Sequence, residues 1–221
     1  MSEAVVRRDT IAARRAGGDV HDRAERRRLI VEAAVRVIED HGADAGLGAI
    51  ADRAGLPRPH VYRHFTGKAD LDQEVARQAS LLLSAWIRPS LTARGTPPDL
   101  IHGIVGRVLR WAAEHPNLYR FRARLGAAAA VGELGDALAA YLRAAGHDAR
   151  PPAHVVAGVI GLVDGAILWW LDHRDETGLD DLAESLAVQV LLVLAETLRR
   201  AGRTIDPAAE LTPVTSPSAP G

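Results

Sequence analysis

Apolar residues recur at helical spacing along most of this chain, and this pattern limits its possible folds more than any other feature. The clearest stripe runs from Leu29 to Ile38, where apolar residues lie at i, i+1, i+4, i+5, i+8 and i+9. Ala and Leu supply 40 and 26 of the 221 residues, which favours helix. There is no alternating strand pattern of useful length and no internal repeat. The sequence therefore predicts an all-α fold.

Breaks in this pattern divide the chain into four segments. Residues 1–24 mix Arg, Asp, Gly and Ala without a sustained period, which predicts a flexible, Arg-containing arm. Residues 25–70 form a head of three short helices, and residues 71–202 form a larger helical body. Residues 203–221 contain prolines among Ser, Thr and Ala, which predicts a disordered tail. After the first stripe, helices are predicted over Leu47–Ala54, from Pro57–Pro59 to Thr66, and over Lys68–Ile87, Asp99–His115, Asn117–Ala130, Glu133–Ala145, Ala153–Arg174 and Asp180–Ala201.

The head has the spacing of a helix-turn-helix unit, in which a second helix can enter the major groove of DNA. Ala51 is small where two helices would cross, Gly55 suits a left-handed turn, and Val61 can reach the shared core. This spacing alone fits an ordinary corner between two helices equally well.

The charge pattern of the head favours the DNA-binding interpretation. From Arg53 to Ala69 there are four cations and no acids, although the whole chain has a formal net charge of −1. An uncompensated cationic window with a Tyr hydroxyl beside it suits contacts to phosphates and base edges. The alternative is a solvated helix face.

Three blocks of the head resemble the N-terminal domain of TetR-family transcriptional repressors. They are Ile30-x-x-Ala33-Ala34-x-x-Val37-Ile38-x-x-x-Gly42, Ile50-Ala51-x-x-Ala54-Gly55-Leu56 and Val61-Tyr62-Arg63-His64-Phe65-x-Gly67-Lys68-x-x-Leu71. The Tyr-x-His-Phe-x-x-Lys-x-x-Leu pattern is a signature of that family. The resemblance covers about residues 26–75, and the body is similar only in the number and order of its helices.

The resemblance implies a homodimer that binds a palindromic operator in double-stranded DNA and releases it when a small-molecule effector enters the body. Residues 25–70 are then the helix-turn-helix DNA-binding domain, and residues 71–202 the effector-binding and dimerisation domain. Family positions place base contacts at the start of the second helix and phosphate contacts just after it. With the remaining cations of the window, the candidate DNA-binding residues are Arg53, Arg58, Pro59, His60, Tyr62, Arg63, His64 and Lys68.

Two departures from the family pattern shift attention to the N-terminal arm. The loop Ala43-Asp44-Ala45-Gly46 lacks the Thr that often binds phosphate, and Pro57 stands where a Ser cap is common. The arm could compensate by reaching a minor groove, as other N-terminal arms do. A leader with no role in binding is an equally good interpretation.

The body contains candidates for an effector pocket, which needs apolar walls and a few polar anchors. The candidate effector-binding residues are Trp111, His115, Tyr119, Arg122, Asp164 and Trp169. Plain core packing is the alternative for each of them. Asp164 interrupts an apolar helix, so it either anchors a ligand or pairs within the core. Apolar walls suggest a lipophilic effector, although Arg120, Arg122 and Arg124 leave room for an anionic one.

The last two predicted helices have wide apolar faces that suit a four-helix dimer interface, with an internal core pair in a monomer as the alternative. The longest apolar run, residues 155–171, contains Asp164 and is better explained as a buried core helix than as a membrane span. We therefore expect a cytoplasmic protein with no membrane partner.

Several function classes are unlikely on composition and motifs alone. The absence of Cys excludes disulfides, Cys-ligated metals and thiol catalysis. His60 and His64 lie at i, i+4, but no third ligand is near in the sequence, so no metal site or other cofactor is predicted. No nucleophile elbow, phosphate loop or ordered acid–base pair indicates an enzyme. The main rival to a DNA-binding regulator is a helical lipophile-binding protein with a vestigial head.

Overall fold

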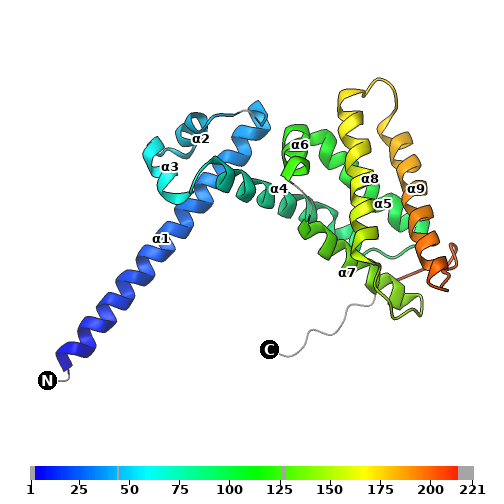
Figure 1. Ribbon diagram of the computed structural model, residues 1–221, viewed down its shortest axis with the longest axis horizontal. Coiled ribbons are helices and arrows are strands. Elements are labelled where there is room, and N and C mark those ends of the chain that lie inside the picture. Colours follow the sequence, from blue (N-terminus) through cyan, green and yellow to red (C-terminus); the bar gives the residue numbers. More distant parts are fainter. Residues whose placement is uncertain (1–2, 44, 126–127, 214–221) are drawn as a thin grey trace. The chain divides into compact units, whose positions relative to one another are not determined.

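The computed structural model describes residues 3–43, 45–125 and 128–213, and these residues form nine α-helices and no strand, as the sequence predicts. Figure 1 shows the helices in chain order. They divide into two compact units, Met1–Gln78 and Ala79–Gly221, and helix α4 (Lys68–Leu91) continues from the first into the second. Each unit is considered separately below.

The first unit packs α2 (Leu47–Ala54) and α3 (Arg58–His64) against the C-terminal half of α1 (Glu3–His41). Its core is built from the stripe that the sequence shows, with Ile30, Ala34 and Val37 buried on α1. Ile50 and Val61 from α2 and α3 are also buried, and burying such side chains contributes about 1.5–3 kcal/mol each. This core therefore holds one side of α3 against α1 and α2, and the opposite side of α3 is exposed to solvent.

Helix α1 begins much earlier than expected. The sequence predicts a flexible arm over residues 1–24 because it lacks a sustained period, whereas α1 is a continuous helix from Glu3. Ala and Arg have high helix propensity and this stretch has no Pro, so a helix can form here without an apolar stripe. Contact between this segment and a minor groove stays a prediction.

The second unit is a helical bundle centred on α5 (Pro97–Glu114), α8 (Ala153–Asp172) and α9 (Leu179–Arg200), which pack on one another. Helix α6 (Pro116–Leu125) contacts α5 and α8, and α7 (Ala128–Ala144) contacts α8. Figure 1 shows α5, α8 and α9 side by side. Leu109, Tyr119, Ile167 and Leu186 are fully buried at the centre of this unit.

Helix α7 differs from the prediction because it runs through Gly132, where we expected a break. A glycine inside a helix costs only about 1 kcal/mol, and the Ala-rich sequence before it favours helix. The expected single helix over Asn117–Ala130 instead ends at Leu125 as α6.

The C-terminal tail is partly ordered, so the prediction of disorder is wrong for residues 203–213. Leu211 exchanges two backbone hydrogen bonds with Gly95, of 3.1 and 2.9 Å, and its side chain is buried against Leu100 and Tyr141. Arg94 also donates to Glu210 at 2.7 Å. One apolar side chain with backbone partners is enough to hold the segment despite its prolines. The rest of the tail lies outside the described residues.

Helix α8 is long and apolar enough to cross a membrane, with a mean hydropathy of 1.7 over its most apolar window. Val156, Val159, Val163 and Ile167 are buried against the bundle, as expected for a core helix. Its opposite side is exposed and contains three glycines, which are Gly158, Gly161 and Gly165.

Candidate functional site: a helix-turn-helix unit and a separate cavity

The turn between α2 and α3 has the geometry that the sequence predicts. Gly55 adopts the left-handed conformation at φ 66° and ψ 27°, which favours glycine because it lacks a Cβ. Its neighbour Leu56 donates to the carbonyl of Ala51 at 3.0 Å, which closes the end of α2. Ala51 is fully buried, so the two helices can cross closely, and Val61 is buried in the same core.

The outer side of α3 presents several of the predicted DNA-binding side chains to solvent. Arg58, Pro59, Tyr62 and Arg63 are exposed, and Tyr62 is 60% exposed although Tyr is a large, partly apolar residue. His60 is half-buried. Two cations, a phenol and an imidazole on a seven-residue helix provide donors for phosphates and base edges.

In the folded structure, acidic residues pair with only some of the cations between Arg53 and Ala69. Arg53 forms an ion pair with Asp40, and Lys68 donates to Asp72 at 3.0 Å. Arg58 and Arg63 form no ion pair with any residue that the structure describes. The free positive charge of the window is therefore concentrated on α3, and Arg53 and Lys68 would have to exchange an acidic partner for a phosphate.

The guanidinium of Arg58 lies beside α2, in the space that a side chain at Gly48 would occupy. A Cβ built at Gly48 would overlap the Arg58 Nη2 atom, so a larger residue there would displace the guanidinium from this position.

Arg27, which the sequence analysis does not single out, ties α1 to the end of α3. It donates to the His64 carbonyl at 2.5 Å and to Asp70 at 3.1 Å, and its guanidinium lies 4.2 Å from the centre of the Phe65 ring. Asp70 also accepts from the Thr66 backbone N–H at 3.0 Å, and this bond, with that from Arg27, lowers the pKa of the Asp70 carboxyl. The side chain of Asp70 therefore caps the start of α4.

His64 is less accessible than a phosphate-contacting residue should be. It is half-buried, and its Nδ1 atom is buried without a hydrogen-bond partner among the described residues. Burial lowers the pKa of His64, and the nearby charges of Arg23 and Arg26 add to the effect. This burial disfavours the protonated form of His64, and its phosphate contact stays a prediction.

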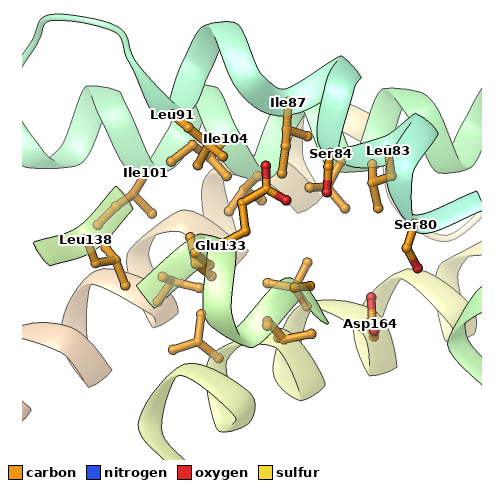
Figure 2. A pocket seen from close by; sticks show the side chains of 18 of the residues that line it. Ser80, Leu83, Ser84, Ile87, Leu91, Ile101, Ile104, Glu133, Leu138 and Asp164 are labelled. Carbon is orange, nitrogen blue, oxygen red and sulfur yellow. The ribbon is translucent and has the colours of Figure 1, made fainter. Parts of the chain in front are cut away.

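The second unit contains a cavity of about 120 Å³, lined by residues of α4, α5, α6, α7, α8 and α9. Figure 2 shows its walls, in which Ile87, Leu91, Ile101 and Ile104 are among the apolar side chains. The polar side chains that line it are Ser80, Ser84, Arg122, Glu133 and Asp164. Apolar walls with a few polar groups are the usual composition of a small-molecule site.

Two of the six predicted effector-binding residues, Arg122 and Asp164, line this cavity. Arg122 is 2% exposed and donates from Nη2 to Asp164 Oδ1 at 2.6 Å, so Asp164 does pair within the core. Tyr119 donates to the same oxygen at 2.5 Å, and burial, with the charge of Asp164, raises the pKa of Tyr119. The second oxygen of Asp164 accepts no hydrogen bond from any described residue.

The other predicted effector-binding residues lie outside the cavity wall. Trp111 and Tyr119 are buried core residues whose ring centres are 6.1 Å apart, and His115 lies 5.1 Å from Trp111. Trp169 is 48% exposed and stacks on His173 at 4.3 Å. The sequence analysis missed Ser80, Ser84 and Glu133, although the two serines lie at i, i+4 on a helix whose pattern it recognised.

A helix-turn-helix unit with a solvent-facing cationic second helix defines a class of DNA-binding proteins. Residues 30–75 match the family described as bacterial regulatory proteins, tetR family. The chain is 39% identical over 70 residues to the HTH-type transcriptional activator FasR of Mycolicibacterium smegmatis. That match covers 31% of this chain and 32% of FasR, so the chain aligns with about a third of the length of that relative.

Solved structures show the same fold over most of the chain. A tetR-family transcriptional regulator from Streptomyces coelicolor has a TM-score of 0.60 and 23% identity, covering 80% of this chain and 83% of its own. FadR from Bacillus subtilis, solved in complex with stearoyl-CoA, has a TM-score of 0.57 and 16% identity, covering 74% and 96%. The family match over residues 30–75 and the fold shared with these solved structures agree with the resemblance to the TetR family noted in the sequence.

Proposed function

We propose that this protein is a transcriptional repressor that binds a palindromic operator as a homodimer and leaves it when a lipophilic molecule enters the cavity. The observation that carries the proposal is the outer side of α3. There Arg58, Tyr62 and Arg63 are solvent-exposed, and neither arginine has an acidic partner among the described residues. Unpaired cations at the positions where this fold contacts DNA favour a functional DNA-binding domain over a vestigial one.

A gel shift on the DNA that flanks the protein's own gene, repeated across a range of salt, tests the DNA-binding part of this proposal. We expect specific retardation and a steep loss of affinity with salt, because contacts between cations and phosphates release counterions. Equal retardation of unrelated DNA of the same length would favour the rival, a lipophile-binding protein without an operator. A reporter fused to the same DNA tests repression against activation, since FasR is named as an activator.

We expect base reading and phosphate contact to separate on α3. His60→Ala should change the ranking of operator variants, because an imidazole at the start of α3 can hydrogen-bond base edges. Tyr62→Phe should weaken every variant alike, by about fivefold, because it removes one hydroxyl contact worth about 1 kcal/mol. The measurement is fluorescence anisotropy on a panel of operators with single base changes. An unchanged ranking with His60→Ala would assign base reading to another residue.

Exposed apolar residues on α8 and α9 support the homodimer. Leu192, Val188 and Trp169 are 64%, 52% and 48% exposed, which is unusual for large apolar side chains on neighbouring helices. At Gly158, Gly161 and Gly165 of α8, no described atom beyond the adjacent residues and backbone of α8 itself lies within 4 Å of where a Cβ would stand, so a partner helix has room to approach. These two helices are those that the sequence pattern indicates for dimerisation.

Leu192→Ser should weaken this dimer without unfolding the chain. Leu192 contributes little to the fold of one chain because most of it is exposed, whereas in the dimer both copies would be buried. We expect the dimer dissociation constant to rise at least about tenfold, since burial of one Leu contributes about 1.5–3 kcal/mol. Sedimentation equilibrium measures the change. Leu125→Ser, a similarly exposed position on α6, is the matched control, and an equal effect there would argue against the α8–α9 interface.

Helix α4 is the element that we propose couples ligand binding in the cavity to DNA binding by α3. It begins at Lys68, beside α3, and its later residues Ser80, Ser84, Ile87 and Leu91 line the cavity. A ligand that fits the cavity better in one position of α4 than in another would change operator affinity by the same free energy.

A further inference from the structure

The cavity is long and follows one helix. Ser80, Ser84, Ile87 and Leu91 lie at i, i+4, i+7 and i+11 on α4, which places them on one side of the helix over about 16 Å at about 1.5 Å per residue. In Figure 2, Ser80 and Asp164 lie at one end of the cavity, and Ile101 and Leu138 lie at the other. The shape suits an extended apolar molecule with its polar group towards one end.

The charges that line the cavity do not balance. Arg122 is its one cation and Asp164 and Glu133 are its two acids. Arg122 is already committed to Asp164 through the 2.6 Å bond from Nη2, and its Nε atom is buried from solvent and from the cavity alike. This pair is neutral as a unit, so it supplies no net positive charge to a ligand.

Glu133 supplies the remaining charge. It is half-buried on α7 and has no hydrogen bond or ion pair with any described residue. Figure 2 shows its carboxylate extending into the cavity towards the wall that contains Ile87 and Ile104. A carboxylate among apolar side chains is costly unless an opposite charge or a donor meets it.

We propose that the ligand of this cavity is a lipophilic cation, an alkyl or aryl amine or ammonium whose charge is met by Glu133. The inference rests on the proposed function, in which this cavity is the effector site, and it names the chemical class of that effector. A positive group forms a charge-assisted contact with Glu133, whereas a carboxylate or phosphate group meets the negative charge of Glu133 and a guanidinium that is already paired with Asp164. The proposed ligand class differs in charge from stearoyl-CoA, the anionic ligand in the FadR structure from Bacillus subtilis.

Three probes of equal chain length test the proposal: decylamine, decanol and decanoate. Isothermal titration of the full-length protein near pH 7, below the concentrations at which the probes form micelles, gives each affinity. We expect decylamine to bind at least tenfold more tightly than decanoate, with decanol between them. In Glu133→Gln the affinity for decylamine should fall at least fivefold while that for decanol stays unchanged, and Glu133→Lys should favour decanoate. Glu114→Gln, an exposed glutamate of α5, is the matched control and should behave as the wild type.

Three results would overturn the proposal: decanoate binding most tightly to the wild type, an unchanged amine-to-alcohol ratio in Glu133→Gln, or no binding of any probe. Each concerns the cavity alone. The gel shift without ligand reports operator binding independently, so a failed ligand class and a failed regulator are distinguishable.

Discussion

Arg58→Glu is expected to abolish measurable operator binding while leaving the fold intact. Arg58 is exposed at the start of α3 and forms no ion pair with the described residues, so its replacement removes no contact on which the core depends. A well-placed arginine contact to a base is worth about 1–3 kcal/mol, and a homodimer loses two of them. The loss of about 2–6 kcal/mol corresponds to at least about thirtyfold in affinity, and charge repulsion from the phosphates adds to it.

Anisotropy on the operator measures this loss, and thermal unfolding checks the fold. Arg36→Glu is the matched control, because Arg36 is exposed on α1 and its replacement makes the same change in net charge. Arg36→Glu should reduce affinity only modestly, through the long-range field. Equal losses for the two variants would mean that bulk charge, rather than α3, determines binding.

Asp164→Ala is expected to destabilise the second unit by about 3–5 kcal/mol, because it leaves the buried Arg122 guanidinium without its counter-charge. The Arg122 side chain is 3% exposed and the Asp164 side chain 17%, so solvent does little to replace the lost partner. Tyr119 loses the acceptor of its hydroxyl at the same time. Urea unfolding at one fixed protein concentration measures the change, since the stability of a dimer depends on concentration.

The exposed ion pair between Arg120 and Asp172 provides the control for this prediction. Its side chains are 35% and 64% exposed, so Asp172→Ala should cost no more than about 1 kcal/mol. If Asp164→Ala costs equally little, Asp164 does not act as a structural partner of Arg122, and anchoring of a ligand becomes its main role.

Local sequence signals predicted the head well because its geometry is local. The bounds of α2, Leu47–Ala54, agree with the prediction, since Gly55 marks the end of the helix and only glycine takes that turn easily. Ala51 and Val61 are buried where the helix-turn-helix spacing requires them. The fold of the first unit could therefore be inferred from short sequence motifs, with few contacts between residues distant in the sequence.

Charge pairing could be predicted only in part. The bond from Lys68 to Asp72 is an i, i+4 helical pair and could have been expected from the sequence. The pair of Arg53 with Asp40 joins two helices, and its formation depends on how α1 and α2 pack. A window of sequence therefore overstates free charge whenever acids on a neighbouring helix reach it.

The cavity was the least predictable feature because residues from six helices line it. Asp164 was recognised as anomalous within an apolar helix, and its partner Arg122 lies 42 residues away. Glu133 gave no signal, since an isolated acid on an amphipathic helix ordinarily faces solvent. The ordered tail was missed for a related reason, because the burial of Leu211 depends on Leu100 and Tyr141 in distant helices.

Selection of the full-length protein on a pool of random duplex DNA measures sequence-specific binding without presuming an operator. We expect enrichment of one inverted repeat, with half-sites centred about one helical turn, or a multiple of it, apart. The selected site should bind about a thousandfold or more tightly than shuffled DNA at physiological salt, and Arg58→Glu should remove that preference. Enrichment of no motif, or equal affinity for selected and shuffled DNA, would contradict the assignment of this protein as a sequence-specific regulator.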